Sequence, residues 1–124
     1  VSLVILLVFL ISELSALDIY VSEDIQTDTT WTSGNSYFLD GIVSVLPEVT
    51  LNIESGTIIR GLHSSKTANG DVSILFVFPG AKIIAKGTPD NPIIFTNEND
   101  NLSEINAYNL GDSDNQIYIL LIKL

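Results

Sequence analysis

Residues 45–57 read VLPEVTLNIESGT and residues 77–88 read VFPGAKIIAKGT, so one short pattern occurs twice in the chain. Pro47 of the first copy falls on Pro79 of the second at an offset of 32 residues, and Leu51 falls on Ile83 at the same offset. Each copy reads as a strand, a proline turn, an alternating strand and a Gly-Thr turn. Repeats of about 20–50 residues are typical of solenoids and propellers, because each unit must stack on a neighbour to bury its apolar face.

The alternating strand of the first copy favours a solenoid. Leu51 and Ile53 fall on one face of this strand, while Thr50, Asn52 and Glu54 fall on the other, as expected when only one face is buried. Strands of about four to five residues that are joined by sharp corners suit a chain that winds around a narrow apolar column. The sequence therefore predicts an all-β fold of the β-helix type.

The other strands are predicted from short runs rich in β-branched residues, separated by turn residues such as Asp40-Gly41 and Pro79-Gly80. The predicted strands are residues 36–39, 42–46, 50–54, 57–60, 73–78, 82–86, 92–96 and 117–122. None of these runs is long enough to predict a sustained helix.

Three segments carry a resemblance to a known family. Residues 21–41, 50–61 and 80–96 resemble, in this order, segments from the opening part of large secreted bacterial parallel β-helix proteins. The resemblance covers residues 19–100 and implies an N-terminal fragment of a right-handed parallel β-helix solenoid. Such proteins are often type IX-secreted surface proteins with a C-terminal sorting domain, generally without an assigned catalytic activity. Family members continue with Gly- and Trp-rich rungs, whereas this chain reads DSDNQIYILLIKL over residues 112–124.

The first sixteen residues, VSLVILLVFLISELSA, are predicted to be a signal-peptide remnant. Their unbroken apolar core, residues 3–11, is far shorter than the roughly 20 residues needed to span a bilayer as a helix, so no stable membrane span is expected. The chain begins with Val1 instead of methionine, which indicates a fragment. A buried N-terminal strand or helix is the alternative for this segment. Export favours a secreted or cell-surface bacterial protein, and the lack of cysteine leaves no acceptor for a lipoprotein anchor.

The remainder is expected to form an N-terminal cap segment, β-helix rungs and a tail. Residues 17–40 are the cap segment, in which Trp31, with Tyr37 and Phe38, covers the apolar interior of the terminal rung. Residues 41–100 are the rungs, and residues 101–124 are a loop and a C-terminal tail. Two alternatives stay open for residues 109–124: a frameshifted, non-native end or a true C-terminal strand. Because an apolar terminal strand has an unpaired edge, we expect this edge to self-associate.

The composition disfavours several classes of function. The chain has 5 Lys and Arg against 15 Asp and Glu, and its formal net charge of −10 disfavours binding to nucleic acid. It has no cysteine and one histidine, which excludes disulfides, Cys-ligated zinc, Fe–S clusters and thiol catalysis. The acidic runs at residues 97–101 and 112–115 lack the pattern of a known calcium loop and are interpreted as solvated loops, like the surface charges Glu23, Asp24 and Asp28. No metal and no cofactor are predicted.

No set of residues in the sequence matches a catalytic pattern, so no catalytic residue is predicted. Glycoside hydrolysis needs two carboxyl groups about 5–9 Å apart, but Glu54 is the only carboxylate within a predicted strand. Arg60, Lys82 and Lys86 could assist an acidic substrate, although the net charge disfavours a polyanion. His63 lies in a polar loop without a nucleophile elbow and is interpreted as an ordinary loop histidine.

The predicted function is a non-catalytic structural or adhesive β-helix segment of an exported cell-surface protein. The first alternative is a carbohydrate-binding module on a β-helix, which predicts that Tyr37, Phe76 and Phe78 lie on an outward strand face. The second alternative is a fragment of a β-helix polysaccharide lyase or hydrolase, which predicts carboxylates clustered on one face of successive rungs. Cell-surface glycans or proteins are the expected partners.

Overall fold

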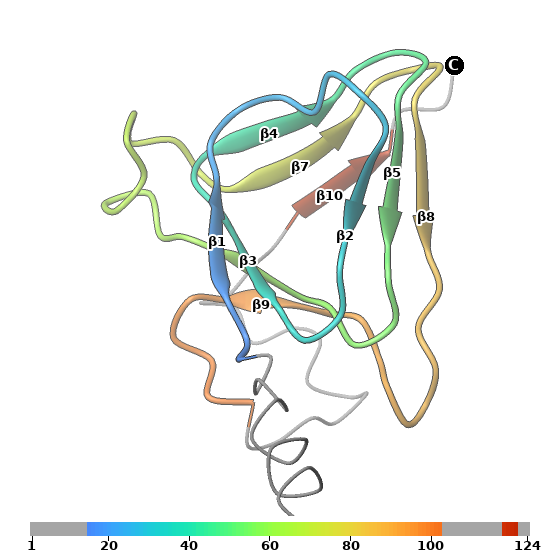
Figure 1. Ribbon diagram of the computed structural model, residues 1–124. Coiled ribbons are helices and arrows are strands. Elements are labelled where there is room, and N and C mark those ends of the chain that lie inside the picture. Colours follow the sequence, from blue (N-terminus) through green and yellow to red (C-terminus); the bar gives the residue numbers. More distant parts are fainter. Residues whose placement is uncertain (1–14, 103–117, 122–124) are drawn as a thin grey trace, which may run out of the picture.

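A computed structural model describes residues 15–102 and 118–121, and within them the chain winds as a three-sided coil of short strands (Figure 1). The described residues contain no helix, so none of them forms a helical membrane span. The strands are β1 Asp18–Val21, β2 Thr29–Trp31, β3 Ser36–Leu39, β4 Ile42–Val45, β5 Thr50–Ile53, β6 Ile58–Gly61, β7 Ile74–Val77, β8 Lys82–Ala85, β9 Ile94–Asn97 and β10 Tyr118–Leu121.

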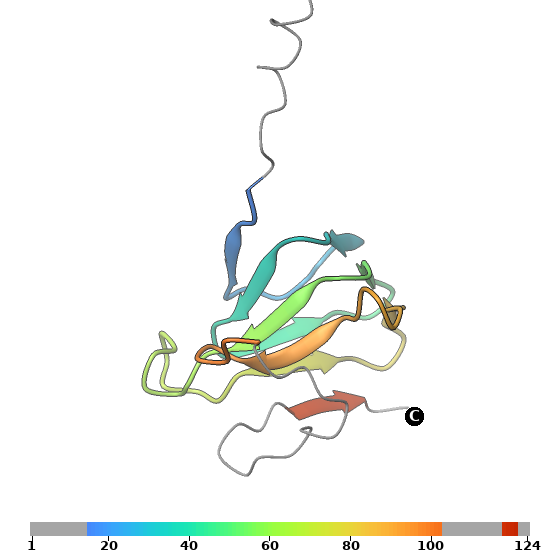
Figure 2. The same cartoon turned by 90° about the horizontal axis from the view of Figure 1, so that it is seen from below.

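Three parallel sheets form the sides of the coil. Sheet A has the order β1-β3-β6-β9, sheet B has the order β10-β7-β4, and sheet C has the order β2-β5-β8. Every strand pairs with a strand from an adjacent turn of the coil and runs parallel to it. Seen from the side in Figure 2, the turns lie one below another. The architecture is a parallel β-helix, which confirms the predicted all-β fold.

The register of the sheets confirms the repeat found in the sequence. Leu51 of β5 lies opposite Ile83 of β8, at the predicted offset. Ile58 of β6 lies opposite Ile94 of β9, so the strand after each copy of the repeat also occupies an equivalent place. The equivalence does not extend to the glycines: Gly56 has a φ of +84°, whereas Gly87 is not among the residues with positive φ.

Eight of the observed strands fall on the eight predicted strands, with ends that differ by at most two residues. The prediction lacked β1 and β2, both of which lie in the segment expected to be a cap. β2 reads TTW and is too short and too polar to stand out as an apolar run, whereas β1 reads DIYV and lies between the apolar first sixteen residues and the polar residues 22–30. They nevertheless pair in register with β3 and β5, so the coil extends through residues 18–31. Residues 1–14, 103–117 and 122–124 lie outside the described residues, as do the signal-peptide prediction and most of the tail.

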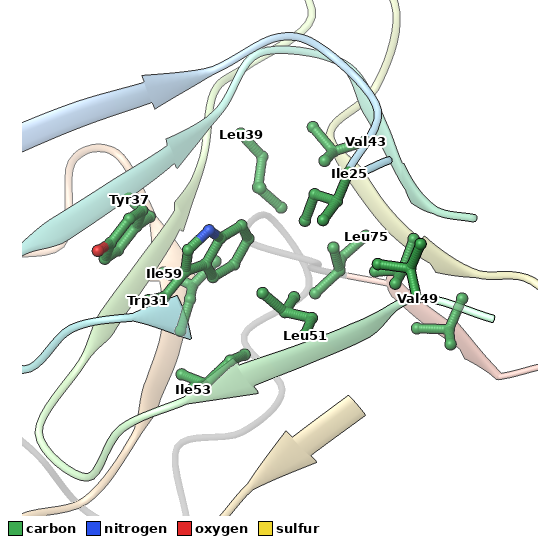
Figure 3. Close-up of a cluster of buried hydrophobic side chains, with 12 residues drawn as sticks. Ile25, Trp31, Tyr37, Leu39, Val43, Val49, Leu51, Ile53, Ile59 and Leu75 are labelled. Atoms are coloured by element: carbon green, nitrogen blue, oxygen red, sulfur yellow. The ribbon is translucent and has the colours of Figure 1, made fainter. Parts of the chain in front are cut away.

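Alternating side chains from all three sheets fill the interior of the coil (Figure 3). Leu39 of sheet A, Val43 and Leu75 of sheet B, and Leu51 of sheet C are completely buried. Figure 3 shows these side chains pointing toward one another from the different sides of the coil. Burial of such aliphatic side chains is worth about 1.5–3 kcal/mol each, so this column is the main source of stability.

Trp31 and Tyr37 belong to this interior, but Phe38 does not. The Trp31 and Tyr37 rings stack with centroids 4.9 Å apart near the first turn of the coil. Phe38 follows Tyr37 in a strand, so it points to the opposite, outer face, where its ring stacks on Tyr20 at 4.9 Å. The prediction that Phe38 covers the interior was therefore wrong.

The corner between sheets B and C is a β-turn that occurs in two successive rungs. In the upper turn, between β4 and β5, the Val49 N–H donates to Leu46 O. In the lower turn, between β7 and β8, the Ala81 N–H donates to Phe78 O. The third residue of the lower turn is Gly80, with a φ of +85°, whereas the upper turn has Glu48 there, with a φ of +68°. A left-handed conformation costs a residue with a Cβ roughly 1–2 kcal/mol. The upper turn is therefore strained.

We expect Glu48→Gly to raise the free energy of unfolding by about 0.5–1 kcal/mol. The relief of left-handed strain exceeds the entropy that glycine adds to the unfolded chain, which is about 0.4–1 kcal/mol. Urea unfolding followed by circular dichroism measures the change. Gly80→Ala in the matching turn is the control and should destabilise the protein. A Glu48→Gly variant that is less stable than the parent would contradict the strain.

Candidate functional site

The outer face of sheet A carries a column of aromatic and polar side chains, one from each rung. The register places Tyr20, Phe38, Arg60 and Thr96 side by side on β1, β3, β6 and β9. Tyr20 is 63% exposed and its ring is nearly parallel to that of Phe38, with an interplanar angle of 17°. The Arg60 guanidinium lies over the other side of the Phe38 ring, 5.9 Å from its centroid. We call these four residues the sheet A column.

The end of the sheet A column that lies on β6 and β9 is hydrogen-bonded to the loop that follows β9. Arg60 Nη1 donates to Asn97 O at 3.0 Å and to Asp100 O at 2.7 Å. The Asp100 carboxylate accepts hydrogen bonds from the Thr96 hydroxyl and from the Leu102 N–H, so both of its oxygens are engaged. These hydrogen bonds, together with the Arg60 charge, lower the pKa of Asp100 and outweigh the desolvation that opposes them. The network therefore holds the loop after β9 against strands β6 and β9.

Asp100 should contribute to stability in a pH-dependent way. Its pKa is lower in the folded state than its ordinary value of 3.8, so the ionised form stabilises the fold above that pH. The contribution is lost as the pH falls through the folded-state pKa. We expect Asp100→Asn to lower the melting temperature at pH 7 and to flatten its decline between about pH 5 and pH 2. Thermal unfolding across this pH range tests this expectation. A melting temperature that falls as steeply with pH in the variant as in the parent would contradict the role of Asp100.

The loop between β6 and β7, residues 62–73, holds the single histidine (Figure 1). His63 Nδ1 is 2.9 Å from Ser65 Oγ and also accepts a hydrogen bond from the Ser65 N–H. Both partners of the ring in the described part of the chain belong to Ser65, so no carboxylate is placed to orient this histidine. The nearby carboxylate of Glu98 pairs instead with Lys66 at 3.2 Å.

Glu98 corrects part of the interpretation of residues 97–101 as a solvated loop. Its side chain is only 9% exposed, and it accepts a hydrogen bond from the His63 N–H at 3.4 Å in addition to the Lys66 ion pair. The described residues hold no group of three side chains that could bind a metal ion. The other acidic run, residues 112–115, lies outside the described residues.

Several other carboxylates bind backbone N–H groups of an adjacent rung. Asp24 accepts from Ser44 at 3.0 Å, and Asp28 accepts from Thr50 at 2.8 Å. These bonds run between the first and second rungs, and each satisfies a donor in or next to a strand of the coil. Asp24 and Asp28 are surface charges, as predicted, but they also hold neighbouring rungs together.

Two further carboxylates act in the same way at other corners. Glu54 Oε2 accepts from the Ser33 N–H at 2.9 Å, and Asp40 Oδ1 accepts from the Ala68 N–H at 2.8 Å. Glu54 lies just after β5 and not within it, so the prediction of a carboxylate inside a strand was wrong. The Glu54 carboxylate instead accepts a hydrogen bond from the turn between β2 and β3.

The cations and aromatic residues considered in the sequence do not converge. Arg60 lies on sheet A, whereas Lys82 begins β8 on sheet C and Lys86 follows that strand. Phe76 and Phe78 are next to each other on sheet B, in an edge-to-face contact of 4.8 Å. Tyr37 is buried in the interior, so the prediction that it could lie on an outward face was wrong. The sequence also missed Tyr20, which lies in the unrecognised strand β1.

A coil of parallel strands around an apolar column places this chain among the β-helix proteins. A family model described as a pectate-lyase like beta helix domain matches residues 23–107, and the chain belongs to this family. The matched segment contains Phe38, Arg60 and Thr96 of the sheet A column and the loop between β6 and β7. A search of curated proteins and a search of solved structures found no match.

Proposed function

We propose that this chain is a non-catalytic structural segment of an exported β-helix protein, in which the stacked rungs act as a rigid spacer or adhesive shaft. One observation carries the proposal: several outward carboxylates accept hydrogen bonds from backbone N–H groups of the coil. Asp24, Asp28 and Glu54 each accept a backbone N–H from an adjacent rung, and both oxygens of Asp100 are engaged. Groups used in this way hold the corners of a shaft and are not free for acid–base chemistry.

Export is supported by the family, because pectate-lyase-like β-helix domains are typically extracellular. The apolar segment at residues 3–11 agrees with an exported chain. A spacer on a cell surface must extend away from that surface. A coil of stacked rungs does so, because it lengthens by about 4.8 Å with each added turn.

Polysaccharide turnover tests the proposal directly. The full chain is incubated with polygalacturonate and with neutral polysaccharides, with and without Ca²⁺, and unsaturated products and reducing ends are measured. We expect no turnover above that of heat-denatured protein. Turnover that is lost in Arg60→Lys, while circular dichroism shows an intact sheet, would overturn the proposal and favour the lyase or hydrolase alternative.

Carbohydrate binding without catalysis is the second candidate function, and the outward aromatic rings favour it. Tyr20 presents an exposed ring on sheet A, and Phe78 presents a partly exposed ring on sheet B. Aromatic faces of this kind stack on the apolar faces of sugar rings. A glycan array with the full chain tests this candidate, with Tyr20→Ala and Phe78→Ala as variants. Binding that either variant abolishes supports it, and no binding to any glycan removes it.

A further inference from the structure

Strand β7 is apolar on both of its faces. Leu75 and Val77 point into the coil and are buried, while Ile74 and Phe76 alternate with them on the outer face and are half-buried. The pattern continues beyond both ends of the strand, with Val72 56% exposed and Phe78 37% exposed. A strand that is covered on one face only normally alternates apolar and polar residues.

A neighbouring strand adds to this apolar surface. Ile42 of β4 lies opposite Ile74 in the register and is 49% exposed. The sheet B patch is therefore made of Ile42, Val72, Ile74, Phe76 and Phe78. In Figure 1 the outer side of β4 and β7 faces away from the coil, and no other strand of the described residues lies over it.

Carboxylates border the sheet B patch. Asp24 lies beside Ser44, whose N–H it binds, and Ser44 is the register partner of Phe76. Asp71 lies beside the corner before β4, where a Cβ on Gly41 would be 3.8 Å from the Asp71 Cβ. The sequence has no lysine or arginine between residues 15 and 59, so the first two rungs supply no cation to this border. A matching partner would carry apolar side chains flanked by positive charge.

The size of the sheet B patch decides between possible occupants. The patch spans two strands, β4 and β7, each about 4.8 Å wide, and each strand has four residues that rise about 3.3 Å, so its face is roughly 10 Å wide and 13 Å long. That is far below the roughly 800 Å² that each partner buries in a stable protein–protein interface, so the patch suits one secondary-structure element of a partner better than the whole face of a second copy of this chain. One α-helix, with a diameter of about 10–12 Å, covers the width of the face. In α/β proteins, helices cover the faces of parallel sheets in this way.

We infer that the sheet B patch is the docking site for one amphipathic helix of a partner protein. The helix packs its apolar stripe across Ile42, Ile74 and Phe76 and directs lysine or arginine side chains toward Asp24 and Asp71. The inference concerns a lateral face of the coil, so it stands whether or not the chain has catalytic activity.

A defined peptide tests the docking site. The probe is a fluorescently labelled 18-residue helix with leucine on one face and lysine on the other, and its counterpart carries glutamate in place of lysine. Titration of the full chain is followed by fluorescence anisotropy. We expect saturable binding of the lysine peptide, with Kd at least tenfold weaker for the double variant Phe76→Ser/Phe78→Ser. Ile84→Ser, on the outer face of sheet C, is the matched control and should bind as the parent does.

A second pair of variants tests the role of charge. The double variant Asp24→Asn/Asp71→Asn removes two charges but leaves an Oδ1 that can accept the Ser44 N–H, so the fold should be kept. It should weaken binding of the lysine peptide several-fold and make the affinity less dependent on salt than that of the parent. If circular dichroism shows that the phenylalanine double variant is unfolded, Ile42→Ser/Val72→Ser replaces it, because both side chains are already half-exposed.

Several results would overturn the inference. Absence of binding by the lysine peptide, equal binding of the glutamate peptide, or an equal loss of affinity in Ile84→Ser would each do so. Vesicles of neutral phosphatidylcholine form a further arm of the experiment. Binding to these vesicles that is lost in the patch variants, without binding to the lysine peptide, would assign the patch to a lipid surface instead.

Discussion

Replacing Trp31 with alanine is expected to lower the free energy of unfolding by about 3–5 kcal/mol. The indole is 3% exposed and belongs to the apolar interior, where it stacks on Tyr37 with an interplanar angle of 16°. Trp31 lies on β2, in the first turn of the coil, and its partner in the next turn is Ile53. Its removal would open a large cavity at the end of the column. Since domains of this size are stable by about 5–15 kcal/mol, much of the stability would be lost.

The variant is measured by urea unfolding with circular dichroism, because the substitution removes the only tryptophan. Tyr20→Ala is the control, since Tyr20 also stacks on an aromatic ring but lies on the outer face. We expect this control to cost only about 0.5–1.5 kcal/mol, the value of an exposed aromatic pair. Equal losses in the two variants would mean that Trp31 does not cover the interior.

The alternating strands of the coil could be predicted because their pattern is local. Leu51 and Ile53 alternate with polar residues, and this alternation alone assigns them to a buried face. The pairing of β5 with β8 could also be predicted, since two similar segments that stack must align at their sequence offset. The fold class therefore followed from one strand and one repeat.

The irregular spacing of the rungs hid the first turn of the coil. In sheet A the register pairs Asp18 with Ser36, Ser36 with Ile58, and Ile58 with Ile94, so the offsets are 18, 22 and 36 residues. The longer offset results from the loops at residues 62–73 and 86–93, which extend corners without disturbing the strands. A search for a fixed period of about 32 residues finds the later turns and misses the earlier ones.

The roles of the acidic residues could not be predicted, for the same reason. Asp24 binds the backbone of Ser44 and Asp28 binds that of Thr50, 20 and 22 residues away. These sequence separations match the 18 to 22 residues of one early turn of the coil, so the hydrogen bonds could be predicted only if the length of that turn were known. Without it, the carboxylates read as solubilising charge. In the structure they satisfy backbone donors, and an unpaired donor of this kind costs about 1–3 kcal/mol when it is buried.

The corner between sheets C and A gives the second large effect, in Gly56→Ala. Gly56 has a φ of +84°, a conformation that costs alanine roughly 1–2 kcal/mol. A Cβ at this position would also collide with the Asn91 amide, which donates to Ser55 O at 3.2 Å. Displacing that amide adds the cost of a lost hydrogen bond, about 1–3 kcal/mol. We expect a total loss of about 2–5 kcal/mol in urea unfolding.

Gly34→Ala separates the two contributions at the equivalent corner of the preceding turn. Gly34 has a φ of +79°, but a Cβ added there would meet no described atom within 4 Å, so its substitution should show the backbone cost alone. The double variant Gly56→Ala/Asn91→Ala removes the collision and should be more stable than the two single losses predict when added, by at least about 1 kcal/mol. Strict additivity would mean that Asn91 moves aside freely. A coupling of the expected size would show that the Asn91 amide fills the space beside Gly56, where it donates to Ser55 O and connects the loop before β9 to the corner before β6.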